Sequence, residues 1–386
     1  MALGLSFFAF NRGLPLTFRS MFYPLFGERV FGWPGHLIDL VTVFATIFGL
    51  ATSLGLGAAQ INAGLSIVLS RTVGLGLPSA TGIQLAIIAV ITAITGLSVW
   101  AGIDRGLKRL STLNVYLMGL LMLFVLAVGP TRYLLEGILR EIGFYVQNLP
   151  HMALFTETFL GEFPKGAAAG WQDTWTIFYW GWWIAWSPFV GLFIARISRG
   201  RSIRQMVLGV LLLPTGFSMT WLGSFGGLAV YTQLELGGQI QQTVARDGAA
   251  YAMFELLGAY PLSTITSTVA VAVVVTFFVT SADSGSQVIA LVTAGGKLDV
   301  PQRQRMLWAV TVGVVAAALL LGGGLDALQT AAITTGLPFA VVILVLIYTL
   351  FQGLAHEHAV LEEIETPSSL SDERRPDALR SDASDD

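Results

Sequence analysis

Six of the ten tryptophans of this chain lie in one short segment, between Trp171 and Trp186. Tryptophan usually marks the interface between a membrane and water, but this run continues into an apolar stretch. The face of an indole ring carries negative potential and attracts a cation that donates no hydrogen bond, with about 0.5–2 kcal/mol per contact. The cluster therefore favours a site for a quaternary ammonium group over an interfacial belt that only packs helices.

On a helix, the rings of this segment would occupy two adjacent faces. One face would carry Trp175, Tyr179, Trp182 and Trp186, and the other Thr176, Trp180 and Trp183. Gly181 and Pro188 fit a helix that is thinned and bent inside the membrane, because proline leaves one backbone carbonyl without its donor. Broken helices of this kind build transporter sites. For Gly181, close packing against another helix explains the residue equally well.

A second polar group, TSADSGS at 280–286, lies inside another apolar stretch. Its hydroxyl and carboxylate side chains are costly in lipid unless they face a cavity or a partner helix. Hydroxyl and carbonyl oxygens at a helix break suit a hard cation such as sodium, which makes Thr280 and Ser281 candidate ligands. Asp283 is the only acid of its span, and a hydrogen bond to a neighbouring helix or a direct role in transport explains it equally well.

A third group, TIFGLATSLGLGAAQINAG at 46–64, mixes hydroxyls with glycines. Thr46 and Ser53 are candidate cation contacts, whereas Gly55 and Gly57 are best explained by close helix packing. The GLG triplet is no phosphate loop, because neither a strand nor a lysine accompanies it.

The elements that position these groups are membrane-spanning helices. The chain is 54% hydrophobic and only 12% charged, whereas a soluble domain carries about 25% charged residues. Stretches of roughly 20 apolar residues predict an all-α integral membrane protein with eight full spans. The predicted spans are 37–57, 81–103, 112–135, 174–195, 206–230, 262–292, 307–325 and 331–353.

Outside the full spans, 58–70 continues the first span or forms a short helix, and the apolar run from Met1 to Phe10 is the end of a helix. An amphipathic helix from Leu134 to Leu149 is expected at the outer interface, and a short helix near Ala250–Gly258. Most loop Lys and Arg residues fall on one side, which predicts a cytoplasmic C-terminus. Residues 355–386 are rich in acidic side chains, and this composition predicts a disordered tail.

Several function classes are disfavoured. The chain has no cysteine, and its four histidines lack the partners of a metal site or a catalytic motif, so we expect no enzyme. The formal net charge of −3 gives no support for a nucleic-acid partner.

Three segments carry a resemblance to the betaine/choline/carnitine transporter family. They are WTIFYWGWWIAWSPFVGLFIARISRGRSIR at 175–204, TSADSGS at 280–286 and ATSLGLGAAQINAGL at 51–65. The resemblance extends from Ala2 to about Leu354. It implies an inverted-repeat (LeuT-like) secondary transporter fold, a homotrimer in the cell membrane, alternating access, and coupling to sodium or protons or exchange.

The resemblance also implies roles for single residues. Trp183 resembles a member of the substrate cage, and the pathway or gate aromatics are Trp180, Trp182, Trp186 and Phe178. Thr280 and Ser281 resemble one sodium site. Thr46 resembles part of another sodium site, with Phe189 and Phe193 nearby. Asp283, Gly181 and Pro188 are expected to have structural or coupling roles.

The chain departs from the family in two respects. It is expected to lack the first helices of the fold, which supply the other half of the cage. Leu50 lies where members that use the Thr46 site have a second threonine, and a leucine side chain cannot bind sodium. This weakens a two-sodium mechanism and leaves room for proton coupling.

The expected organisation has four parts. Residues 1–135 form a remnant of the first repeat, 136–170 an interfacial helix with an outer loop, 171–354 the second repeat, and 355–386 the tail. The predicted function is uptake of a quaternary-ammonium solute such as glycine betaine or choline. The alternative is a non-transporting membrane protein of the same fold, acting as a sensor or an inert remnant.

Overall fold

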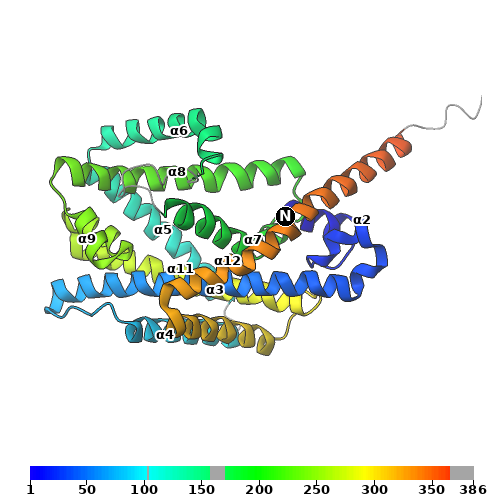
Figure 1. Ribbon diagram of the computed structural model, residues 1–386, viewed down its shortest axis with the longest axis horizontal. Helices are drawn as coiled ribbons and strands as arrows, with labels where there is room; N and C mark the ends of the chain where they lie inside the picture. Colours follow the sequence, from blue (N-terminus) through cyan, green and yellow to red (C-terminus); the bar gives the residue numbers. More distant parts are fainter. Residues whose placement is uncertain (102–103, 157–169, 366–386) are drawn as a thin grey trace, which may run out of the picture.

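The computed structural model describes residues 1–101, 104–156 and 170–365, which form helices joined by short turns with no strand among them (Figure 1). The predicted all-α class is therefore confirmed. Residues 366–386 of the predicted tail, and 157–169 of the predicted outer loop, lie outside the described residues.

In the first half of the chain, short helical segments precede one long central helix, and three further helices follow it. The elements are α1 Ala2–Ser6, η1 Phe7–Asn11, η2 Arg19–Phe22, α2 Tyr23–Phe26, η3 Gly27–Phe31, α3 Trp33–Val73, α4 Thr81–Ala101, α5 Asp104–Val128 and α6 Thr131–Ala153. The predicted first span and its continuation at 58–70 are a single helix, α3, which ends where Gly74 adopts a left-handed φ of 72°.

The second half contains the tryptophan cluster and the second polar group. Its elements are η5 Gln172–Phe178, α7 Tyr179–Ile197, α8 Ile203–Glu235, α9 Ile240–Asp247, η6 Ala249–Tyr251, α10 Ala252–Gly258, α11 Ser263–Thr293 and α12 Gln302–Glu365. The short helix predicted near 250–258 corresponds to η6 and α10.

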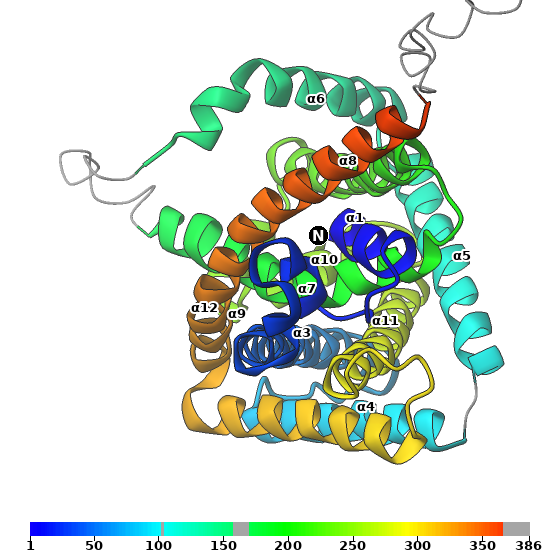
Figure 2. The ribbon, with the colours of Figure 1, turned by 90° about the vertical axis from the view of Figure 1, so that its right-hand side faces the viewer.

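Seven helices among the described residues are long and apolar enough to cross a membrane. The last of these, α12, contains both final predicted spans. They meet where the backbone leaves helical geometry, at Gly323 and Gly324. Gly324 has a φ of 67°, which glycine adopts without steric cost. In Figure 2 the first half of α12 lies along α4, and the second half turns away across the molecule. The eight predicted spans are thus present, with two joined at a glycine kink.

Two boundaries differ from the prediction. The third span, α5, ends at Val128 instead of residue 135, and α6 begins at Thr131 with Pro130 as its N-cap. Proline cannot continue α5, because it has no N–H to donate. The helix α12 also continues to Glu365, into the segment predicted to be disordered, where Glu357 pairs with Arg12 at 2.8 Å.

The long helix α3 lies at the centre and packs against α4, α7, α11 and α12 (Figure 2). Its packing against α11 follows a regular register. Leu50 lies against Gly285, a Cβ on Gly57 would overlap the ring of Phe278, and a Cβ on Gly64 would overlap Val271. Successive contacts are seven residues apart on both helices, so α3 and α11 run antiparallel with one small residue in each pair.

Candidate functional site

The segment with the tryptophans forms a continuous helix with an irregular start. The π-helical turn η5 precedes α7, and α7 then runs without interruption through Gly181 and Pro188. The helix is therefore not broken at Gly181 or Pro188, and the irregular backbone lies earlier, in η5. The packing interpretation of Gly181 agrees with the structure, because a Cβ on Gly181 would lie 3.3 Å from the Cα of Ile333 in α12.

Pro188 frees the carbonyl of Ile184, as expected from its position, but this carbonyl has a partner. The hydroxyl of Ser187 donates to the Ile184 oxygen at 2.6 Å. The helix thus keeps its backbone satisfied inside an apolar segment, where an unpaired carbonyl would be costly.

The aromatic side chains of η5 and α7 form a connected series, which we call the aromatic ladder. Ring centroids are 6.0 Å apart for Trp175–Tyr179, 6.1 Å for Tyr179–Trp183, 5.9 Å for Trp183–Trp186 and 5.1 Å for Trp186–Phe189. Trp182 joins from the side, stacked on Phe178 at 5.8 Å. The ladder joins most of the predicted cage residues.

Two contacts fix the ladder to α3. The indole Nε1 of Trp182 donates to Ser53 Oγ at 3.1 Å and lies 3.3 Å from the Gly49 carbonyl oxygen. Beside this bond, α3 and α7 approach closely, because a Cβ on Gly49 would lie 3.0 Å from the Ala185 carbonyl carbon. Ser53, predicted as a cation contact, thus holds Trp182 in place.

The predicted cage residues differ in accessibility. Trp183 is 45% exposed, whereas Phe178 and Phe189 are buried. Trp186 is half-buried, and its Nε1 has no hydrogen-bond partner among the described residues. Trp180 (64% exposed) and Phe193 (47% exposed) stand outside the ladder. Among the predicted cage residues that belong to the ladder, Trp183 is therefore the most exposed.

The second polar group lies within α11, which has no helix break at 280–286. The hydroxyl of Thr280 donates within its own helix, 3.0 Å from the carbonyl oxygens of Thr276 and Phe277, and Ser281 is half-buried. Carbonyls freed by a helix break, which we expected beside these hydroxyls, are absent from the described part of α11.

Thr46 is buried, and its hydroxyl donates to the Thr42 carbonyl at 2.7 Å. One turn along α3, Leu50 is also buried and covers Gly285 of α11. A leucine here fills the groove above the glycine, so the position serves packing between the helices.

The register of α3 and α11 separates the two candidate ion positions. It places Thr280 level with Gly55, nine residues from Thr46 along α3. At 1.5 Å per residue this is about 13 Å, too far for one ion to touch both hydroxyls. The two threonines therefore belong to separate places, as the resemblance implies.

Asp283 has a cationic neighbour on another helix. Its Oδ1 lies 3.8 Å from Arg305 Nη2 of α12, and both side chains are largely buried. Nothing in the spacing of the sequence predicts this pair, because Asp283 and Arg305 lie on different helices, α11 and α12. The contact supports the structural interpretation of Asp283.

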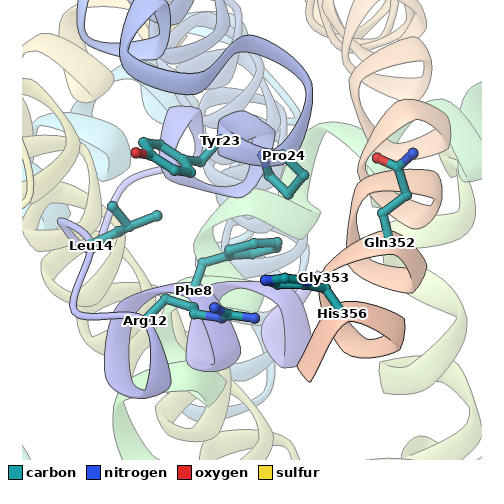
Figure 3. Close-up of a pocket in the computed structure, with 8 residues that line it drawn as sticks. All are labelled: Phe8, Arg12, Leu14, Tyr23, Pro24, Gln352, Gly353 and His356. Atoms are coloured by element: carbon teal, nitrogen blue, oxygen red, sulfur yellow. The ribbon is translucent and has the colours of Figure 1, made fainter. Parts of the chain in front are cut away.

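A cavity of about 530 Å³ lies apart from the ladder, between the N-terminal segment and α12 (Figure 3). Arg12 and His356 lie side by side on its wall, and Tyr23 lies on the other side of Phe8 with its hydroxyl pointing away from them. The pKa of Tyr23 is raised, because its hydroxyl donates to the nearby Glu28 carboxylate. Arg12 is paired with Glu357 at 2.8 Å, and no ring of the ladder lines this cavity.

Comparison with known proteins gives consistent matches. The family model of the betaine/carnitine/choline family transporters matches residues 1–359. A glycine betaine/proline/choline transporter of Vibrio parahaemolyticus is 47% identical over 92% of this chain, and the chain spans 62% of that protein. The glycine betaine transporter OpuD of Bacillus subtilis is 40% identical over 97% of this chain, and the chain spans 70% of it.

Proposed function

Because the chain belongs to the betaine/carnitine/choline transporter family, we propose that it acts in secondary uptake of a quaternary-ammonium solute such as glycine betaine or choline. The observation that carries the proposal is the aromatic ladder, in which the accessible ring of Trp183 lies between Tyr179 and Trp186. These rings hold a trimethylammonium group by cation–π attraction, which needs no hydrogen bond from the ligand.

The ladder also offers a hydrogen-bond donor to the other end of such a solute. The buried Nε1 of Trp186 has no acceptor among the described residues, and an unmade hydrogen bond there costs about 1–3 kcal/mol. A ligand carboxylate or hydroxyl oxygen would remove this cost. A zwitterion therefore matches the ladder at both ends, with its cation on Trp183 and its oxygen on Trp186.

Coupling to sodium or to protons is part of the proposal, and the residues favour different roles for the two candidate positions. Sodium coupling would use Thr280 and Ser281, whose hydroxyls lie on a half-buried surface of α11. At Thr46 the neighbouring Leu50 removes one oxygen ligand, which favours at most one sodium ion per cycle.

The proposed setting is the cell membrane, crossed several times, with the C-terminus in the cytoplasm and three copies assembled as a homotrimer. The distribution of Lys and Arg supports the orientation. A non-transporting sensor of the same fold is the alternative. The structure of α7 and α11 favours it, because the carbonyl that Pro188 frees already accepts from Ser187 and α11 has no break.

The test is uptake of radiolabelled choline and glycine betaine into liposomes containing the purified chain. Replacing Trp183 by Leu should weaken solute affinity by about 2–30-fold, the equivalent of 0.5–2 kcal/mol. Trp100→Leu is the matched control, because Trp100 is also an exposed tryptophan on a spanning helix (68% exposed). Binding without uptake in the unmodified chain would favour the sensor, and no binding of either solute would refute the proposal.

A further inference from the structure

A charged cluster joins the segment before α3 to the first turns of that helix. Arg19 of η2 pairs with Asp39 of α3, with Arg19 Nε lying 2.9 Å from Asp39 Oδ2, and the Arg19 backbone N–H donates to Asp39 Oδ1 at 3.2 Å. Both side chains are largely buried. Figure 1 shows this segment folded over the N-terminal end of α3. The pair therefore fastens η2 to α3 at two points.

The same guanidinium has a further partner, the exposed ring of His36. Arg19 Nη1 lies 3.2 Å from His36 Nδ1. A guanidinium can only donate, so Nδ1 must accept, and the ring is neutral with its proton on Nε2. A second proton, on Nδ1, would remove this hydrogen bond and place two cations in contact. It would also put a positive charge in the first turn of α3, where the helix dipole disfavours it.

In the part of the chain that the structure describes, no other charged side chain compensates a proton on His36. Glu28 of η3 accepts instead from a tyrosine hydroxyl at 2.8 Å. Arg29 of η3 and Lys297 after α11 would only add to the repulsion, and neither bonds to His36. Both carboxylate oxygens of Asp39 already contact the arginine. A proton on His36 therefore competes directly with the arginine contact.

The cluster also reaches the end of α11. A Cβ on Gly295 would lie 3.4 Å from Arg19 Nη2, and a Cβ on Gly296 would lie 2.8 Å from the backbone nitrogen of Leu16. The segment thus lies between α3 and the C-terminal end of α11, the two helices that carry the candidate ion positions. We infer that His36 is a proton-binding site, and that a proton bound there loosens η2 from α3 and from the end of α11. Under the proposed orientation this face meets the cytoplasm, so the site responds to cytoplasmic acidification.

The test is hydrogen–deuterium exchange of the η2 amides, measured by mass spectrometry in lipid nanodiscs at pH 8 and pH 5. A free histidine has a pKa of about 6.5, so proton binding favours the opened segment by up to about 30-fold at pH 5 and by almost nothing at pH 8. The contact thus stabilises the segment above about pH 6.5, and this stability is lost as the pH falls. The opening constant of η2 should rise by about 10–30-fold from pH 8 to pH 5, after correction for the intrinsic exchange rate.

Two replacements of His36 separate its proton from every other titrating group. His36→Gln keeps an acceptor for Arg19 but binds no proton, so at pH 5 the unmodified chain should open about 10–30-fold more than this variant, and at pH 8 the two should agree. Both chains retain Asp39 and are compared at one pH, so the carboxylate and the intrinsic exchange rate cancel. His36→Lys carries a permanent charge and should open η2 at both pH values. His151→Gln, at an exposed histidine of α6, is the matched control and should behave like the unmodified chain.

Equal opening of the unmodified chain and of His36→Gln at pH 5 would overturn the inference, and so would a His36→Lys variant that stays closed at pH 8. The inference does not depend on the proposed function, because the measurement follows amide exchange and not uptake. A chain that takes up no solute can show the pH response, and a transporting chain can lack it, so the two failures are distinguishable.

Discussion

The pairing of Ser187 with the carbonyl that Pro188 frees gives a quantitative prediction about α7. Ser187→Ala removes the hydroxyl that donates to the Ile184 oxygen at 2.6 Å. In the unmodified chain no backbone N–H can replace it, since residue 188 is proline. In a Pro188→Ala background the new N–H of residue 188 can donate to the same oxygen, so the hydroxyl becomes redundant.

The expected changes in the free energy of unfolding follow from this difference between the two backgrounds. Leaving a buried carbonyl unpaired costs about 1–3 kcal/mol, so Ser187→Ala should lower the free energy of unfolding by that amount. In the Pro188→Ala background the same replacement should cost at most about 0.5 kcal/mol. The two changes should therefore be coupled by about 0.5–3 kcal/mol in a double-mutant cycle.

The assay is reversible unfolding by sodium dodecyl sulfate in mixed micelles, followed by circular dichroism. Ser224→Ala in α8 is the control, since the Ser224 hydroxyl donates to Thr220 at 2.6 Å. The Thr220 carbonyl also accepts from the backbone N–H of residue 224 in the helix, so losing the Ser224 hydroxyl should cost little stability. Equal costs of Ser187→Ala in the two backgrounds would refute the reasoning.

Two further predictions concern the contacts of α3. Gly57→Ala should displace the Phe278 ring and destabilise the protein by about 1–3 kcal/mol in the same unfolding assay. Gly226→Ala is the control and should be nearly neutral, because a Cβ at Gly226 meets nothing within 4 Å. Equal effects of the two replacements would contradict the packing of Gly57 against Phe278. Trp182→Phe should cost about 0.5–1.5 kcal/mol through loss of the bond to Ser53. Ser53→Ala should add almost nothing to it, whereas additive costs would count against that bond.

Much of the aromatic ladder could be predicted from the sequence, because helical periodicity alone decides which side chains of one helix are neighbours. The sequence placed Trp182 and Trp186 on one face, and the structure joins them through Trp183. Periodicity says nothing about the partner helix. The bond from Trp182 to Ser53 depends on how α3 and α7 cross, and that crossing is set by small residues that occur throughout both helices.

The predicted breaks failed for a related reason. Glycine and proline disrupt helices in water, but inside a packed membrane protein neighbouring groups can supply the missing hydrogen bonds and packing contacts. Gly181 lets α12 approach α7, and Ser187 supplies the bond that Pro188 removes. The sequence shows the residue that weakens a helix, whereas the compensating contact appears only in three dimensions. At Gly323 and Gly324, in contrast, the backbone does leave helical geometry.

The register of α3 and α11 has a consequence for the proposed ion positions. Leu50 covers Gly285 at a level between Thr46 and Thr280, with both residues buried. An ion could pass between the two threonines along this interface only if Leu50 left the groove, which exposes a leucine side chain and leaves a gap over the glycine. Emptying such a packed site costs about 2–5 kcal/mol in protein cores. If the proposed ion binds at Thr280, its movement to Thr46 therefore requires the two helices to separate.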